Sequence, residues 1–171
     1  MKKTVVLLAL PLMLAGGVHG WAFSPTLGLM NTEVGYTYNN AADGVHGAHI
    51  EISPLNKVAI GAEYRHWNHR GNETDIYAKY KIGRVYFGIG NRNYYDRDAK
   101  LFGMVGGKAN LLGPLDAYAG LKVSSEEREY RAGLNLNLVP TSLDVDVNYT
   151  YYDRDHIDHE GGVGVGINYH F

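Results

Sequence analysis

The sequence predicts an all-β protein: an antiparallel up-and-down transmembrane β-barrel of ten strands with short loops, or of eight longer strands as the alternative. Three observations support this prediction. Ten segments alternate apolar and polar residues with period two. One face of these segments contains no Asp, Glu, Lys or Arg. Beyond its first 20 residues, the chain has no apolar run near the roughly 18 residues that a membrane-spanning helix needs.

The N-terminus has the pattern of a secretory signal peptide. Two lysines follow the first methionine, an apolar run covers residues 5–15, and small residues come next. Cleavage is predicted after Gly20, with cleavage after Ala22 as the alternative. Residues 1–20 are therefore assigned to a cleaved signal and residues 21–171 to one barrel domain.

Charge and cysteine content narrow the classes of function. The chain has no cysteine, which excludes a lipoprotein anchor and a disulfide framework. Without the two lysines of the signal, 14 basic and 18 acidic residues are left. This mildly acidic balance gives no reason to expect binding to nucleic acid.

Each alternating segment is close to the roughly 9–11 residues with which a tilted strand crosses a bilayer. The segments cover residues 27–39, 44–53, 57–67, 73–82, 84–95, 99–111, 116–124, 128–138, 143–152 and 161–171. Their uncharged face is predicted to meet lipid, because a basic residue facing the bilayer midplane costs about 2–4 kcal/mol.

The opposite face is charged and is predicted to line the lumen. Its residues are Glu33, Glu51, Glu63, Arg65, Asp75, Lys79, Lys81, Arg92, Lys108, Lys122, Glu129, Arg131, Asp144 and Asp146. Ten strands about 4.8 Å apart with a tilt of roughly 40° form a cylinder about 20 Å across, which side chains largely fill. We therefore expect a narrow or salt-bridge-plugged lumen, with a narrow aqueous pore as the alternative.

Two finer expectations concern the interior. A turn centred near residue 70 would place Arg65 opposite Asp75 and Glu63 diagonal to Lys79. Glycines on the inward face would leave room for a pore; they include Gly61, Gly88, Gly90, Gly106, Gly120 and Gly133. In the last segment, Gly162, Gly164 and Gly166 leave one wall without side chains, so a passage, if one exists, is expected there.

The connections between segments alternate in character. Tight connections with Pro or Gly are placed in the periplasm, at residues 53–56, 83–84, 112–115 and 139–142. More polar connections are placed outside the cell, at residues 39–43, 68–72, 96–100, 124–127 and 153–160. An even number of strands then returns the C-terminus to the periplasm.

The C-terminal hairpin carries a family resemblance. Residues 141–151, a short loop and residues 162–171 alternate strictly and end on Phe171. This hairpin resembles the last hairpin of small Gram-negative outer-membrane barrels and is similar to the YfaZ-like and opacity-protein-like families. The resemblance implies a location in the outer membrane. It also implies that Ile167, Tyr169 and Phe171 form the membrane-insertion signal read by the barrel-assembly machinery.

Two stretches could carry chemistry. Residues 64–69 resemble the His-x-Ser-Asn stretch of lipid A deacylases, with His66 as the base. However, Asn68 occupies the nucleophile position, and an acyl transfer needs a hydroxyl there. Residues 153–160 contain Asp, Glu and His but do not follow the calcium-loop pattern. A solvated loop, bridged by divalent ions to lipopolysaccharide phosphates, is the favoured interpretation.

These observations predict a structural or porin-like outer-membrane protein without catalysis, cofactor or metal. The expected partners are outer-membrane lipid and lipopolysaccharide, and, during biogenesis, the secretion and barrel-assembly machineries. The alternatives are a small passive diffusion channel, a surface adhesin and a lipid A-modifying enzyme.

Overall fold

The computed structural model describes residues 31–95, 98–138, 141–155 and 159–171. The predicted signal sequence and the start of the first predicted strand lie outside these residues. The described chain forms ten strands and one short 3-10 helix. They are β1 (Asn31–Asn39), η1 (Ala41–Asp43), β2 (Val45–Leu55), β3 (Val58–Trp67), β4 (Gly71–Ile82), β5 (Val85–Tyr94), β6 (Lys100–Leu112), β7 (Leu115–Ser124), β8 (Glu127–Leu138), β9 (Leu143–Arg154) and β10 (Glu160–His170).

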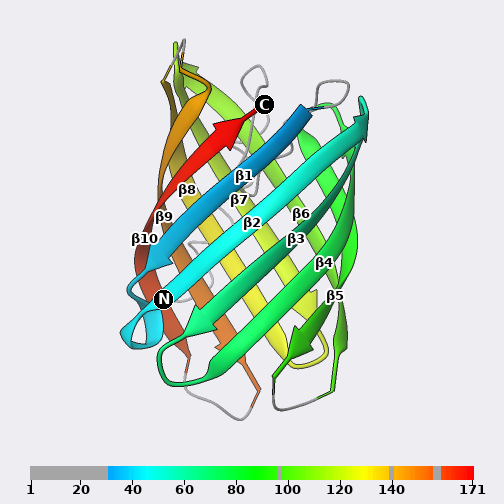
Figure 1. Ribbon diagram of the computed structural model, residues 1–171, viewed down its shortest axis with the longest axis vertical. Helices are drawn as coiled ribbons and strands as arrows, with labels where there is room; N and C mark the ends of the chain where they lie inside the picture. The colour runs from blue at the N-terminus through cyan, green and yellow to red at the C-terminus, as the bar shows by residue number, and fades with distance from the viewer. Residues whose placement is uncertain (1–30, 96–97, 139–140, 156–158) are drawn as a thin grey trace, which may run out of the picture.

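Every strand pairs antiparallel with its neighbours in sequence, and β1 pairs with β10 to close the barrel (Figure 1). The prediction of an all-β, ten-stranded antiparallel barrel is confirmed, and the eight-stranded alternative is wrong. Closure pairs Glu33 with His170, so the sheet begins and ends at the same rim. Among the described residues, no helix is long and apolar enough to cross a membrane.

The barrel has two distinct ends. At one end, called the turn end, lie the tight connections 56–57, 83–84 and 113–114, together with residues 141–142 before β9. The two-residue turn before β5 requires a left-handed backbone, which Gly83 supplies with a φ of 60°. At the other end, called the loop end, lie η1 and the other connections between strands.

The register of the β3–β4 hairpin differs from the expected one. Glu63 lies opposite Asp75 and Arg65 opposite Glu73, so the expected Arg65–Asp75 register is wrong. The loop is residues 68–70, and Gly71, with a φ of 81°, begins β4. The left-handed glycine therefore shortens the loop and centres the hairpin one residue earlier than expected. Each residue of β3 therefore pairs with a residue of β4 two positions earlier than expected. Because side chains alternate with period two, this shift leaves every side chain on its expected inward or outward face.

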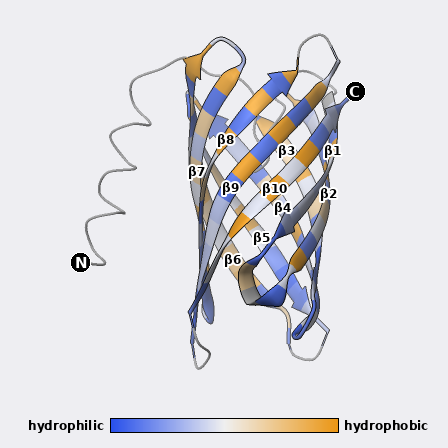
Figure 2. Ribbon diagram, turned by 90° about the vertical axis from the view of Figure 1, so that its left-hand side faces the viewer, coloured by the Kyte–Doolittle hydropathy of each residue, from blue (hydrophilic) through white to orange (hydrophobic). Residues whose placement is uncertain are grey.

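Hydrophilic and hydrophobic residues alternate along the strands (Figure 2), and the exposed, outward-facing residues across the middle of the barrel are apolar. Exposed large hydrophobic residues from many strands form this belt, among them Ile50, Ile60, Ile76, Phe87, Ile89, Leu101, Leu134, Val147, Val165 and Ile167. The outward charges Arg128 and Asp153 lie near the loop end, where they pair at 3.5 Å. An exposed apolar belt around a closed sheet is the surface of a transmembrane barrel.

Candidate functional site in the barrel interior

The predicted lumen-lining residues lie inside the barrel with one partial exception. Thirteen of the fourteen are buried, each at most 9% exposed. Lys81 is half-buried near the turn end, at the mouth. Because the strands are closed and alternate, these side chains converge on one interior, where they form ion pairs at two levels.

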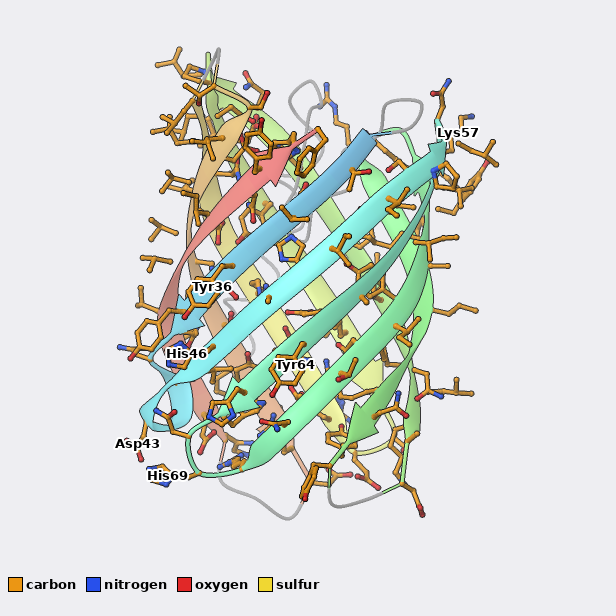
Figure 3. All side chains as sticks on the ribbon, in the orientation of Figure 1. Tyr36, Asp43, His46, Lys57, Tyr64 and His69 are labelled. Atoms are coloured by element: carbon orange, nitrogen blue, oxygen red, sulfur yellow. The ribbon has the colours of Figure 1, made fainter. Side chains whose placement is uncertain are left out.

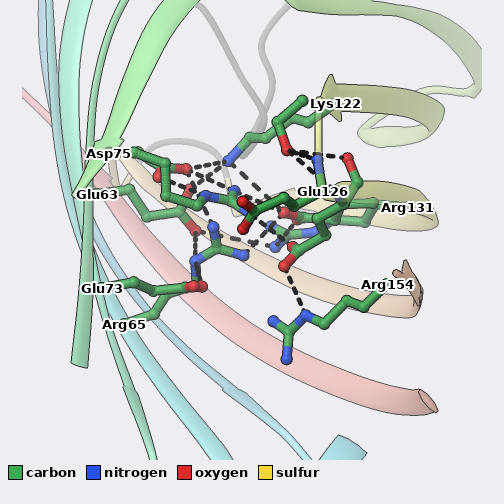
Figure 4. A network of polar contacts seen from close by, with 12 residues as sticks. Glu63, Arg65, Glu73, Asp75, Lys122, Glu126, Arg131 and Arg154 are labelled. Atoms are coloured by element: carbon green, nitrogen blue, oxygen red, sulfur yellow. Dashed lines mark hydrogen bonds and ion pairs between the residues drawn. The ribbon is translucent and has the colours of Figure 1, made fainter. Parts of the chain in front are cut away.

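The first level is a charged network in the loop-end half of the lumen, shown in Figure 4. Its core contains five acidic and five basic residues, so its formal charge is zero. They are Glu63, Glu73, Asp75, Glu127 and Glu129 with Arg65, Arg92, Lys122, Arg131 and Arg154. These residues come from β3, β4, β5, β7, β8 and β9, so the network spans the lumen.

Arg65 joins three carboxylates. Its Nε lies 2.9 Å from Glu73 Oε1, its Nη2 3.0 Å from Asp75 Oδ2, and its Nη1 2.8 Å from Glu129 Oε2. The contact with Glu129 joins β3 to β8 directly across the interior. A guanidinium suits this position, because its planar fork donates to several carboxylates at once.

Arg92 forms a second hub beside Arg65. Its Nε and Nη2 donate to the two oxygens of Asp75 at 2.7 and 2.8 Å, and its Nη1 donates to Glu127 at 2.5 Å. Glu127 in turn accepts a bond from Arg154 Nε at 2.5 Å. The ion pairs therefore continue from the middle of the lumen to its loop-end mouth.

Lys122 and Arg131 complete the network. Lys122 Nζ lies 2.7 Å from Glu63 and 3.1 Å from Asp75, and Arg131 donates to Glu129 at 3.0 Å. Buried charges are costly to leave without a partner, so this pairing is what allows so many of them inside.

Next to the network, four aromatic side chains and one methionine form a buried cluster that we call the collar, and its Phe102 also contacts Arg92 and Lys122 of the network. Its residues are Tyr77, Tyr86, Phe102, Met104 and Tyr118, all buried and in contact. Each lies against a glycine of a neighbouring strand. A Cβ atom added to Gly61 would lie 2.5 Å from Tyr77, and one added to Gly106 would lie 2.3 Å from Tyr86. A Cβ atom added to Gly90 would lie 2.4 Å from Phe102, and one added to Gly88 would lie 2.8 Å from Met104. A Cβ atom added to Gly133 would lie 2.9 Å from Tyr118.

The collar changes the meaning of the inward glycines. We expected them to leave space for a pore, but at these five positions the space is taken by a ring or a methionine. The glycines lack a side chain because a large residue across the strand pair needs the volume. The expectation of room at these positions is therefore wrong.

The glycine wall of β10 is likewise occupied. A Cβ atom on Gly162 would lie 2.3 Å from Asn39 Oδ1, one on Gly164 2.8 Å from Asn148 Oδ1, and one on Gly166 2.9 Å from Thr37 Cγ2. The expectation of a passage along this wall is therefore not supported by the packing. A small cavity of about 10 Å³, room for about one water, lies nearby and is lined in part by Thr37 and Thr150.

A second level of ion pairs lies at the turn end. Lys79 Nζ pairs with Glu51 at 2.5 Å, and Lys108 Nζ pairs with Asp116 at 2.5 Å. Two histidines also contact carboxylates at this level. His49 lies 2.9 Å from Glu33, and His170 lies 2.7 Å from Asp144 and 3.5 Å from Glu33.

The loop-end mouth is covered by an aromatic cap. Trp67 and Tyr152 pack edge to face with ring centroids 4.8 Å apart, and both are buried. The guanidinium of Arg154 lies 4.2 Å from the centre of the Trp67 ring, a cation–π contact. Ala41 of η1 and Val45 pack in the same buried cluster. The lumen is therefore filled at three levels: cap, network and collar.

Several interior residues were missed by the sequence prediction. They are the charged residues Glu73, Asp116, Glu127 and Arg154 and the aromatic residues of the collar and cap. All of them share the alternation of the predicted lumen residues. Extending the alternation to the strand ends, and to tyrosine and tryptophan as well as charged residues, would have identified them.

The two stretches that were considered for chemistry lie at the loop end; Arg65, Trp67 and Arg154 of these stretches point into the lumen, and the residues proposed for chemistry do not. His66 faces outward and its Nδ1 lies 2.6 Å from Asn72 Oδ1, while Asn68 donates to the carbonyl of Asp43 at 2.8 Å. Asn68 therefore ties two loops together. In the last loop, His159 contacts Asp153 at 2.9 Å, and residues 156–158 lie outside the described chain. Within the described chain, no three His, Asp or Glu residues are arranged to hold a metal ion.

The predicted insertion-signal residues lie on the outward face of the last strand. Ile167 is 48%, Tyr169 40% and Phe171 70% exposed. The rings of Tyr169 and Phe171 meet edge to face at 4.8 Å, and the amide of Phe171 donates to the carbonyl of Thr32. The end of the chain is thus fixed to β1 with its aromatic ring exposed.

Comparison with known proteins supports the fold. No protein-family model matches the sequence, and no curated protein matches it, so the resemblance to YfaZ-like and opacity-protein-like proteins stays a prediction. The solved KdgM porin is similar, with a TM-score of 0.52 at 12% identity over 81% of this chain and 99% of its own. The N-terminal β-barrel domain of Pseudomonas aeruginosa OprF is also similar, with a TM-score of 0.47 at 14% identity over 84% of this chain and 99% of its own.

The similarity to the KdgM porin fold, the closed sheet and the apolar belt agree with one another. The fold of this chain is that of an outer-membrane β-barrel.

Proposed function

We propose that this protein is an exported outer-membrane barrel with a closed lumen, which acts as a structural membrane protein and neither conducts solutes nor catalyses a reaction. The observation that carries the proposal is the filled interior. An ion-paired network that spans the lumen lies in series with the aromatic collar, and each blocks the path by itself. The turn end faces the periplasm in this proposal, as short turns do in such barrels.

The charge of the network supports a structural role. Five acidic and five basic residues balance, so the network itself offers no excess charge to attract ions of one sign. To open a path, several buried ion pairs would have to separate together. Removing one partner of a buried pair typically costs about 3–5 kcal/mol, so thermal opening is rare.

Planar bilayer recordings test the closed lumen. The wild-type barrel is expected to give no conductance steps, because both barriers are in place. Replacing Tyr77, Tyr86 and Tyr118 with alanine removes the collar but leaves the network, so this variant should also be silent. Adding Arg65→Ala and Glu129→Ala removes a cation and an anion together and should produce steps.

The three proteins must first be shown to fold, by the heat-dependent shift in gel migration typical of membrane barrels. Reproducible steps from the wild-type protein would contradict the proposal. They would support the second candidate, a narrow passive channel. That candidate is favoured by the polar cavity beside Thr37 and Thr150, and it predicts steps that change when Arg65 or Arg92 is replaced.

A lipid A-modifying enzyme and an adhesin are weaker candidates. The His66 stretch has no hydroxyl at the nucleophile position, and Asn68 is occupied in a loop contact. Expression of an enzyme would alter the mass of lipid A, and we expect an unchanged spectrum. An adhesin would need loops that reach a ligand, and it predicts that exchange of residues 153–160 abolishes cell binding.

We further propose that Ile167, Tyr169 and Phe171 are read by the barrel-assembly machinery, after export by the signal in residues 1–20. Deletion of Phe171 is expected to reduce the folded barrel in the outer membrane several-fold. Its ring is 70% exposed and adds little to packing, so the same deletion should cost little stability in the purified barrel. Equal loss in both measurements would mean that Phe171 acts on stability and not on recognition.

A further inference from the structure

Three basic residues gather at the turn end on neighbouring strands. Lys57 lies in the β2–β3 turn, Arg84 in the β4–β5 turn, and Lys81 near the end of β4. The amide of Lys81 donates to the carbonyl of Lys57 at 2.9 Å, so the two lysines lie opposite each other in the ladder. We call Lys57, Lys81 and Arg84 the basic rim.

The two lysines of the basic rim have no acidic partner among the residues that the structure describes. Other lysines at this level do have one: Lys79 pairs with Glu51, and Lys108 with Asp116. Like charges directly opposite in a strand pair repel each other, so Lys57 and Lys81 are costly where they stand. Their arrangement therefore suits a negatively charged group supplied from outside the chain.

At the opposite end of the barrel, basic residues pair with acidic ones. There Arg70 pairs with Glu160, Lys100 with Glu126 and Arg128 with Asp153. Figure 3 shows Lys57 at one rim and Asp43 and His69 at the other. Lys57 and Lys81 therefore differ from these paired cations. The difference does not come from a general excess of basic residues, because the full chain has 16 basic and 18 acidic residues.

The surroundings of the basic rim indicate where the missing negative charge comes from. Directly beside it, on the outward face, Leu55 is 60%, Tyr80 48% and Ile82 61% exposed. These side chains belong to the apolar belt and mark the level at which acyl chains give way to headgroups. Lysine places a flexible apolar stem along such a surface and holds its ammonium group at the headgroup level.

We propose that the basic rim binds the phosphate group of an anionic phospholipid in the periplasmic leaflet, with Leu55, Tyr80 and Ile82 against its acyl chains. The proposal rests on the proposed orientation in the outer membrane. Lys57, exposed in its turn, contacts the phosphate oxygens. Lys81, half-buried at the mouth, and Arg84, in the next turn, add positive potential behind it.

Native mass spectrometry of the barrel in detergent micelles tests the proposal. Phosphatidylglycerol and phosphatidylcholine are titrated against the wild-type protein and two triple variants. The rim variant carries Lys57→Gln, Lys81→Gln and Arg84→Gln. The matched control carries Arg70→Gln, Lys100→Gln and Arg128→Gln, which removes the same charge from the loop end.

The wild-type barrel and the control are expected to retain phosphatidylglycerol in preference to phosphatidylcholine. The rim variant should bind phosphatidylglycerol roughly 10- to 100-fold more weakly, the sum of three basic contacts near a charged headgroup. If the rim variant does not fold, Lys57→Gln alone, in an exposed turn, should weaken binding several-fold.

Equal binding of the two lipids, or undiminished binding by the rim variant, would overturn the proposal. So would equal competition by soluble glycerol phosphate, because the ligand would then be a free phosphate compound and not a lipid. These outcomes do not depend on whether the lumen is closed. A silent barrel that fails to select phosphatidylglycerol would refute the lipid site alone, and a conducting barrel that selects it would refute the closed lumen alone.

Discussion

Replacement of Arg65 with methionine is expected to lower the free energy of unfolding by about 3–5 kcal/mol, because it leaves buried carboxylates without their shared cation. The carboxylates are those of Glu73, Asp75 and Glu129, each within 3.0 Å of the guanidinium. Methionine keeps much of the volume of arginine, so the loss reports on charge more than on a cavity. Urea unfolding of the barrel in lipid vesicles, followed by tryptophan fluorescence, gives the value.

Arg128→Met is the matched control for Arg65→Met. The side chain of Arg128 is 59% exposed and lies 3.5 Å from Asp153, so its loss should change stability by less than about 1 kcal/mol. A second check uses Glu73→Gln. Added to Arg65→Met, it should restore part of the lost stability, because it removes a buried negative charge that has lost its ion pair with Arg65. Equal losses of unfolding free energy in Arg65→Met and Arg128→Met would show that the buried network contributes no more to stability than a surface ion pair.

The outward belt gives the second large effect. Ile89 lies in the middle of β5, is 74% exposed, and is flanked by Ala78 and Gly103 on the neighbouring strands. Ile89→Arg is expected to destabilise the barrel in lipid vesicles by about 2–4 kcal/mol, since arginine would face the bilayer midplane.

The control for Ile89→Arg lies on the same strand and the same face. Asn93 is exposed near the loop end of β5, where the cost of an arginine falls to about 0–1 kcal/mol. The difference in stability between the two variants therefore measures how the cost of an arginine depends on its depth in the membrane. If Asn93→Arg were as destabilising as Ile89→Arg, the outward face would not be a lipid-facing belt.

The strands could be predicted from the sequence because alternation is a local property. Each residue's face follows from its position within one strand, so Glu33, Arg65 and Lys108 were assigned inward without knowledge of their partners. Strand number followed from the same pattern. The register of the β3–β4 hairpin was missed by one position at the turn, because the left-handed conformation of Gly71 cannot be read from its identity alone.

The pairing inside the lumen could not be predicted in the same way. Arg65 and Glu129 are 64 residues apart and meet across the barrel, and Arg92 reaches Glu127 from three strands away. Such contacts depend on the closure of the sheet and on side-chain rotamers, and neither leaves a local signal in the sequence. Most of the inward charged residues could be identified from the sequence, but their pairing could not.

The aromatic collar was missed for a different reason. Tyrosine in a membrane barrel usually marks the interface, so its presence in a strand does not by itself indicate an interior layer. Tyr77, Tyr86 and Tyr118 share the alternation of the charged residues, which places them inside. Their partners on neighbouring strands are the inward glycines, and a glycine opposite an inward aromatic residue is the pattern that identifies a filled layer.

Thiol labelling inside the lumen tests the closed interior most directly. The chain has no cysteine, so a single introduced thiol gives an unambiguous signal. Thr150, 1% exposed, lies beside the small cavity of the loop-end half, and Ser125 is exposed in the β7–β8 loop. In the folded barrel, a bulky charged thiol reagent should modify Ser125→Cys rapidly and Thr150→Cys only after urea unfolding. Equally rapid modification of Thr150→Cys in the folded barrel would show that the lumen is open to solvent and would contradict this account.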